Sequence, residues 1–148
     1  MSYQEKRSLV SLFSSILIAV VYSAYMLQRL PQADPYSAEV FRYWGSFLLI
    51  LIPVAIVAKV IIHILFSIVN TISTREDEPS VTDERDRSIE LKANTNSLYI
   101  FMIGFLLAMA SLVVDQPPTT MFIILIAAGV LSEAVGNISE FFFYRRGF

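Results

Sequence analysis

Cysteine is absent from this 148-residue sequence, and histidine occurs only once. Without cysteine, the chain has no disulfide bond, no thiolate metal ligand and no thiol nucleophile. A single histidine excludes metal and haem sites that one subunit would build from several imidazoles. The sequence also lacks a glycine-rich phosphate loop, a His-Glu-x-x-His pattern and a nucleophile elbow. We therefore expect no metal, no cofactor and no enzymatic activity. An intramembrane serine or aspartate hydrolase stays formally open, but Asp34 and Asp115 lie outside the apolar runs described next.

Charged residues are scarce as well. They make up 16% of the chain, whereas a soluble domain carries about 25%. The deficit is concentrated in four apolar runs, at residues 9–27, 44–72, 98–114 and 120–143. About 20 apolar residues in a helix cross a hydrocarbon layer of roughly 30 Å, and a helix satisfies its own backbone in lipid. The sequence therefore predicts an all-α fold, an integral membrane antiparallel four-helix bundle that forms a single transmembrane domain over residues 1–148. The second run is longer than required, so we expect it to tilt.

Basic residues outside the runs predict the orientation, because loops rich in lysine and arginine remain in the cytoplasm. Eight of them lie on one side and two on the other. We therefore expect both termini and the connection at residues 73–97 in the cytoplasm, in a multi-pass protein of the cell (cytoplasmic or inner) membrane. The eight are Lys6, Arg7, Arg75, Arg85, Arg87, Lys92, Arg145 and Arg146, and the two are Arg29 and Arg42. A net charge of −2 without a basic patch argues against nucleic acid as a partner.

The first run follows Lys6 and Arg7, as the apolar core of a secretory signal would. It is long for such a signal, and no small-x-small cleavage site follows it. We therefore expect a retained first span.

Prolines mark both short connections on the outer side. Pro31 and Pro35 separate the first two runs, and Pro117 and Pro118 precede the fourth, where a missing backbone donor costs nothing. Such turns join antiparallel neighbours, so spans one and two, and spans three and four, should form hairpins. Pro53 lies inside the second span and should kink it.

The connection before the third span is the one charge-rich part of the chain. Thr82 or Asp83 can cap a helix that then runs without a breaker to Asp115. Its exposed start is a candidate docking surface for a cytoplasmic partner, and the alternative is a solvated helix start that merely fixes orientation. A weak metal site there is unsupported, because the segment has neither histidine nor a calcium loop. The candidate docking residues are Asp83, Glu84, Arg85, Asp86, Arg87, Glu90 and Lys92.

The same segment carries a resemblance to known proteins. Asp83-Glu84-Arg85, followed by Ile89 and by Lys92-Ala93 at the entry to a transmembrane helix, resembles a group of small uncharacterised prokaryotic membrane proteins with about four spans. The likeness covers this segment and the pattern of spans. It implies a fold and a membrane location, and it assigns no catalytic residue.

Polar residues inside the second and fourth runs form two stripes. Lys59, His63 and Asn70 share one face of the second span, and Glu133, Asn137 and Glu140 share one face of the fourth. Lys59 lies about 22 Å along its helix from Trp44, and Glu133 about 21 Å along its own from Thr119. Lys59 thus matches Glu133 in depth, and His63 matches Asn137. We therefore take Lys59, His63, Glu133 and Asn137 as a candidate intramembrane seam.

Three interpretations of this seam remain open. Lys59 and Glu133 can neutralise each other and lock two helices together. Alternatively, the seam is a proton or ion relay or a binding site, because charge inside a bilayer is expensive and often functional. As a third alternative, the Lys59 ammonium group reaches the interface by snorkelling.

Small residues at helical spacing predict where helices pack closely. They recur in the first, third and fourth spans, at Ser8, Ser11, Ser14, Ser15 and Ser23, at Gly104, Ala108 and Ser111, and at Gly129, Ser132 and Gly136.

Two functions follow as hypotheses. The first is a non-enzymatic membrane protein that acts through association, as an accessory, regulatory or sensory subunit. The second is a small transporter or an ion- or proton-conducting oligomer that uses the Lys59, His63 and Glu133 seam. In either case we expect the protein to lie in a lipid bilayer and to form a homo-oligomer or part of a larger membrane complex.

Overall fold

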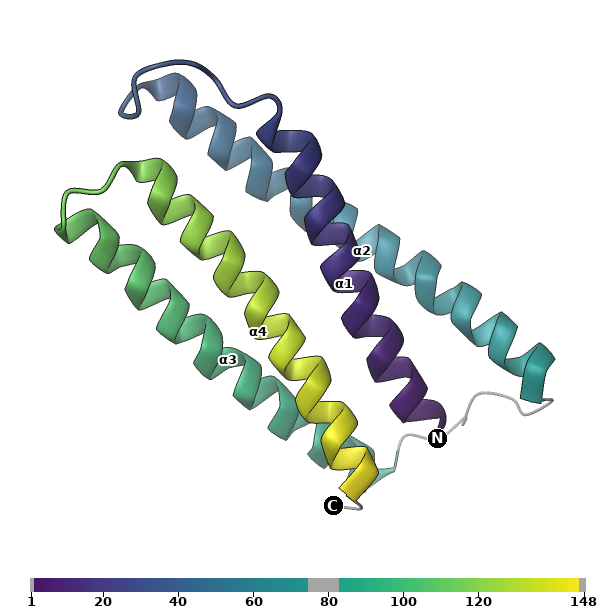
Figure 1. Cartoon of the computed structure of the whole chain (residues 1–148). Coiled ribbons are helices and arrows are strands. Elements are labelled where there is room, and N and C mark those ends of the chain that lie inside the picture. Colours follow the sequence, from purple (N-terminus) through teal and green to yellow (C-terminus); the bar gives the residue numbers. More distant parts are fainter. Residues whose placement is uncertain (1, 75–82, 147–148) are drawn as a thin grey trace.

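The computed structural model describes residues 2–74 and 83–146, and it is all-helical over those ranges. Its helices are α1 (Tyr3–Leu27), α2 (Ala38–Thr74), α3 (Glu84–Val113) and α4 (Pro118–Arg146) (Figure 1). Each is long and apolar enough to cross a membrane. The all-α class and the four candidate spans are therefore confirmed. Arg75 and the rest of residues 75–82, which belong to the predicted connection, lie outside the described residues.

The helices alternate in direction. Figure 1 shows the start of α1, the end of α2, the start of α3 and the end of α4 at one end of the bundle. The connections at residues 28–37 and 114–117 lie at the other end, and they close the two predicted hairpins. Asp115, in the second of these turns, has a left-handed backbone with φ of 58°. Pro118 begins α4, at a position where the backbone nitrogen makes no hydrogen bond within the helix, so the proline costs none.

Two helix starts show how local sequence sets the helix ends. Ser2 caps α1, because its hydroxyl accepts from the backbone nitrogen of Glu5 and Glu5 accepts from Ser2 in return, both at 3.2 Å. This capping box begins the helix several residues before the apolar run at residue 9. Asp83 caps α3 by accepting from the backbone nitrogen of Glu84 at 2.7 Å. The predicted continuous rod from this cap to the outer turn is confirmed.

Small residues allow α3 and α4 to pack tightly along their length. A Cβ atom added at Gly104 would lie 2.2 Å from Cβ of Ala128, and one added at Gly136 would lie 3.2 Å from Cβ of Ser97. The predicted close packing is correct at these two glycines. It is wrong at Gly129, where an added Cβ atom would meet nothing within 4 Å because that residue faces a cavity.

The first part of α2 is anchored in an aromatic core. Trp44 is 1% exposed and stacks on Phe122 of α4, with ring centroids 5.6 Å apart and an interplanar angle of 8°. Tyr22 of α1 packs edge-on against Phe47, and its hydroxyl donates to the carbonyl oxygen of Phe47 at 2.9 Å. This core fixes α1, α2 and α4 to one another near the outer turns.

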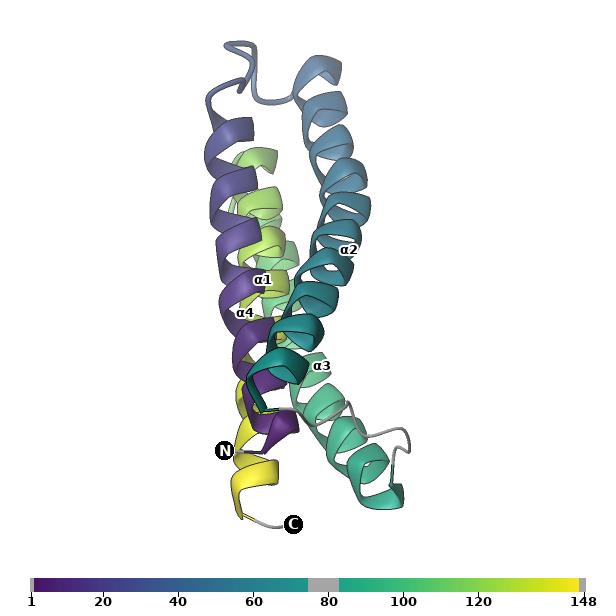
Figure 2. The ribbon, with the colours of Figure 1, turned by 90° about the vertical axis from the view of Figure 1, so that its right-hand side faces the viewer.

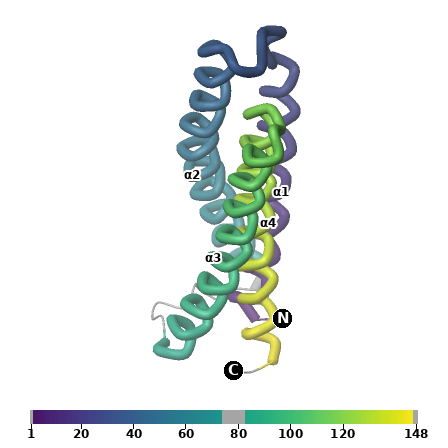
Figure 3. The backbone as a smooth tube through the Cα atoms, turned by 90° about the vertical axis from the view of Figure 1, so that its left-hand side faces the viewer, coloured from purple at the N-terminus to yellow at the C-terminus, as the bar shows by residue number. Residues whose placement is uncertain are grey.

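Beyond that core, α2 has few protein neighbours. It packs against α1, meets α4 over a short stretch, and does not pack directly on α3 in the described ranges. The helix continues without interruption through Pro53. Figure 2 shows it bowed, and Figures 2 and 3 show it apart from α3. This separation leaves room beside the polar residues of its second half.

Candidate functional site

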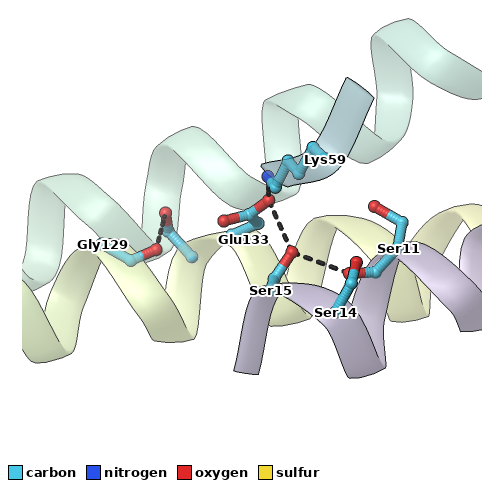
Figure 4. Close-up of polar contacts among 7 residues, drawn as sticks. Ser11, Ser14, Ser15, Lys59, Gly129 and Glu133 are labelled. Carbon is cyan, nitrogen blue, oxygen red and sulfur yellow. Dashed lines mark hydrogen bonds and ion pairs between the residues drawn. The ribbon is translucent and has the colours of Figure 1, made fainter. Parts of the chain in front are cut away.

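The centre of the site is an ion pair between α2 and α4. Nζ of Lys59 contacts Oε1 of Glu133 (Figure 4). The side chains are 29% and 37% exposed, so the bundle does not fully enclose the pair. The sequence predicts this contact, because Lys59 and Glu133 lie at the same depth along their helices. Because α2 and α4 touch over a short stretch only, the pair is a principal polar link between them.

Ser15 of α1 is a third member of this cluster. Its Oγ lies 2.8 Å from Oε1 of Glu133 and 2.7 Å from the carbonyl oxygen of Ser11 (Figure 4). A hydroxyl group has one hydrogen to donate, so these two acceptors compete for it. If Glu133 is protonated, it can donate to Ser15 while Ser15 donates to Ser11. The geometry therefore accommodates Glu133 with or without its proton.

A second serine–glutamate contact repeats the first, closer to the end of the bundle where α1 begins. The Ser8 hydroxyl donates to the carbonyl oxygen of Gln4 at 3.0 Å and lies near the Glu140 carboxyl group. Ser8 and Ser15 are seven residues apart on α1, and so are Glu133 and Glu140 on α4. Seven residues are about two helical turns, which bring the same faces of both helices together again. We call Ser8, Ser15, Glu133 and Glu140 the serine–glutamate ladder.

Asn137 lies on α4 between the two glutamates of the ladder. Its Nδ2 is buried and has no hydrogen-bond partner within the described ranges. His63, which lies at the same depth as Asn137, lines a cavity together with Arg7. The structure thus joins Lys59 to Glu133 and places His63 in the wall of that cavity.

Two cavities border the central ion pair. The first, of about 420 Å³, lies toward the outer end and is mostly apolar, with Leu51, Ile126 and Gly129 among its lining residues. The second, of about 500 Å³, lies between the start of α1 and the second half of α2. Lys59 lines both, and Glu133 lines the first. The pair therefore stands between an apolar cavity and a more polar one.

The far end of the ladder meets charged residues from two other helices, α1 and α3. Glu140 lies within electrostatic reach of Arg7 on α1 and of Asp86 and Glu90 on α3. Tyr144, one turn further along α4, lies near the carboxyl group of Asp86. The ladder thus leads from the middle of α4 to the charged end of the bundle.

The candidate docking segment is the first part of α3. Ile89 and Ala93 are buried, and they fix the helix to its neighbours. Asp86 is half-buried beside Tyr144. The remaining candidates, Asp83, Glu84, Arg85, Arg87, Glu90 and Lys92, are exposed. In Figure 3 this part of α3 diverges from α4, at the end of the bundle where α1 begins.

The spacing of the α1 serines predicts a packing role for them, and nothing in the sequence pattern indicates Ser8, Ser15 or Arg7 as neighbours of α4 carboxylates. One feature of the sequence could have indicated these contacts: the two serines and the two glutamates are each seven residues apart, in spans predicted to run antiparallel.

In the part of the chain that the structure describes, no group of histidine, aspartate and glutamate side chains could hold a metal ion.

Comparison with protein-family models, with curated proteins and with solved structures finds no match to this chain. The resemblance carried by Asp83–Ala93 stays a prediction.

Proposed function

We propose that this chain is a non-enzymatic membrane transport protein that moves protons, with Glu133 as its central group. The observation that carries the proposal is the position of the Lys59–Glu133 pair. A polar ladder reaches it from one end of the bundle, and a cavity borders it on the other side. An ion pair with a purely structural role needs neither feature.

The ladder supplies groups that can pass a proton along α4. A proton held at Glu140 must cross about 10 Å, the length of two helical turns, to reach Ser15. The buried Nδ2–H of Asn137 has no partner in the described ranges and belongs to this stretch of α4, so it can orient a water molecule on the proton's path. At its end, Ser15 gives its hydroxyl hydrogen to Glu133 and takes the incoming proton, so its own state is unchanged. This exchange fits the geometry, because the Ser15 hydroxyl lies within hydrogen-bond distance of both the Ser11 carbonyl oxygen and the Glu133 carboxyl group.

Protonation of Glu133 would weaken the link between two helices. A neutral carboxyl no longer forms an ion pair with Lys59, and α2 has little other contact with α4 beyond the outer core. The Lys59 ammonium group also borders the more polar second cavity, where water can solvate it. Movement of α2 would then widen the first cavity and expose Glu133 to the other side, which is the change that alternating access requires.

The test is proton flux into liposomes that contain the purified chain and a trapped pH-sensitive dye, driven by a valinomycin-clamped potassium gradient. We expect flux above that of empty liposomes, a loss of at least tenfold in Glu133→Gln, and a smaller loss in Ser15→Ala. Glu39→Gln is the matched control, because Glu39 is exposed near the outer turn. The proposal would be refuted if the Glu133→Gln variant moved protons as fast as the wild type does, or if the wild type gave no flux above that of empty liposomes.

Association is the second candidate function, and the exposed start of α3 favours it. Six charged side chains of both signs project from a helix that Ile89 and Ala93 fix in place. A rigid surface with mixed charge suits a complementary protein partner. A photocrosslinking residue at exposed Ser88 should give a discrete adduct in native membranes, and the same residue at exposed Ser46 should not. Equal labelling at both positions would contradict a docking role.

We also infer the orientation and the assembly. The asymmetry of basic residues supports cytoplasmic termini in the cell membrane. The partly exposed ion pair supports a homo-oligomer or a larger complex, since a charged pair facing lipid is costly. Cysteine accessibility at Ser2 and Gln32, measured from each side of the membrane, tests the orientation.

A further inference from the structure

The second cavity has the chemistry of an anion site. Each polar side chain in its wall can donate a hydrogen bond, and none is a carboxylate. Two of these side chains, Arg7 and Lys59, are cations. The full polar set is Tyr3, Arg7, Lys59, His63 and Ser67.

Two carboxylates outside the cavity wall face its two cations. Glu133 neutralises Lys59, and Glu140 lies within reach of Arg7. Both carboxylates belong to α4 and neither lines the cavity. Lys6 adds a further cation nearby, where its Nζ donates to Oδ1 of Asn70 at 3.5 Å and joins the start of α1 to the end of α2. A ligand in the cavity therefore meets hydrogen-bond donors and no carboxylate in the wall.

The rest of the wall is aliphatic. Val60, Ile64 and Ile68 follow one another at intervals of four residues on α2, and each is more than half exposed. They form a continuous apolar stripe beside the donors. A small inorganic anion has no use for such a stripe, whereas an acyl chain would lie along it.

The cavity also lies at a suitable depth. Tyr3 and Arg7 belong to the first two turns of α1, and Ser67 lies close to the end of α2. Both helix ends are at the same end of the bundle, where phospholipid headgroups would lie. Basic pockets between transmembrane helices at this depth are typical binding sites for anionic lipid headgroups.

We propose that this cavity binds an anionic phospholipid, with its phosphate on Arg7 and His63 and an acyl chain along Val60, Ile64 and Ile68. The bound lipid supplies the second half of α2 with the neighbour that α3 and α4 do not provide. It thereby stabilises α2 against the bundle. This proposal does not depend on proton transport.

The experiment measures lipid binding to the full chain in detergent, by native mass spectrometry and by thermal unfolding. The probes are phosphatidylglycerol, phosphatidylcholine and inorganic phosphate. We expect phosphatidylglycerol to bind with defined stoichiometry and to raise the midpoint of unfolding, with little effect from the other two. Arg7→Gln should weaken phosphatidylglycerol binding about fivefold, as expected for one basic contact.

Two further variants keep the test decisive. Arg7→Lys retains the charge and should retain most of the binding, which separates lost contact from lost folding. Arg42→Gln removes an exposed arginine at the opposite end of α2 and should bind as the wild type does. Equal stabilisation by phosphatidylcholine, equal stabilisation by inorganic phosphate, or equal losses in Arg7→Gln and Arg42→Gln would each overturn the proposal.

Discussion

Replacing Lys59 by methionine tests whether the ion pair holds α2 to α4. The change removes the ammonium group and keeps a flexible apolar side chain, so Glu133 loses its cation while Ser15 still donates to it. Breaking a fully buried pair costs about 3–5 kcal/mol. Both side chains are about one-third exposed, and one hydrogen bond to Glu133 survives, so we expect a smaller loss of about 1–3 kcal/mol.

The companion variant Glu133→Gln isolates the interaction. Alone, it leaves Lys59 without a carboxylate. Combined with Lys59→Met, it leaves a neutral amide that Ser15 can still reach, so the unpaired charge disappears. We therefore expect the double variant to recover at least half of the stability lost in Lys59→Met, with a coupling energy of about 1–2 kcal/mol between the two positions.

Thermal unfolding in one detergent, followed by circular dichroism for all four proteins of the cycle, provides the measurement. For a chain of this length, 1 kcal/mol corresponds to a shift in Tm of about 2–4 °C. Lys59→Met should therefore lower Tm by several degrees, and the double variant should lie between it and the wild type. Strictly additive effects would refute the argument, because they would mean that the two side chains do not stabilise each other.

Three further predictions concern packing, a hydrogen bond and the ladder. Gly104→Ala should destabilise the protein by about 1–3 kcal/mol, because the added methyl group overlaps Ala128, whereas Gly129→Ala meets open space and should be close to neutral in the same unfolding assay. Tyr22→Phe removes the hydroxyl that donates to Phe47 and should cost about 0.5–1.5 kcal/mol, while Tyr99→Phe, at an exposed position, should leave Tm unchanged. Asn137→Leu removes an amide nitrogen that has no hydrogen-bond partner in the described ranges, so Tm should stay the same or rise, whereas proton flux should fall. If Tm rises and flux is unchanged, Asn137 has no role in proton transfer along the ladder.

The candidate site was partly predictable. Lys59 and Glu133 meet because the distance along a helix is fixed by its rise per residue, and both outer helix ends are marked in the sequence. His63 and Asn137 have matching depth as well, but depth specifies only a level, and it leaves open which way each helix face is turned. That His63 lines the second cavity could not be predicted from depth. Rotation about the helix axis depends on packing against every neighbour.

The serines of α1 illustrate the same limit. Their spacing is visible in the sequence, and small residues most often mark close helix contact. Whether Ser8 and Ser15 face carboxylates or aliphatic side chains depends on which helix α1 lies against. In the structure that helix is α4, which runs antiparallel to α1. Ser8 and Ser15 on α1 then lie level with Glu140 and Glu133 on α4, because each pair is seven residues apart.

The sequence by itself determined the four candidate spans, a helix cap at Thr82 or Asp83 and a start of α4 near Pro117 and Pro118. Apolar run length, capping and proline geometry act over a few neighbouring residues, and the structure has the cap at Asp83 and the helix start at Pro118. Only the tertiary structure decided that Gly104 packs tightly while Gly129 faces a cavity, that Ser15 joins the Lys59–Glu133 pair, and that α2 stands apart from α3. Between transmembrane helices the hydrophobic effect supplies little preference for one apolar face over another. The arrangement is therefore set by shape and by a few polar contacts between residues far apart in the chain.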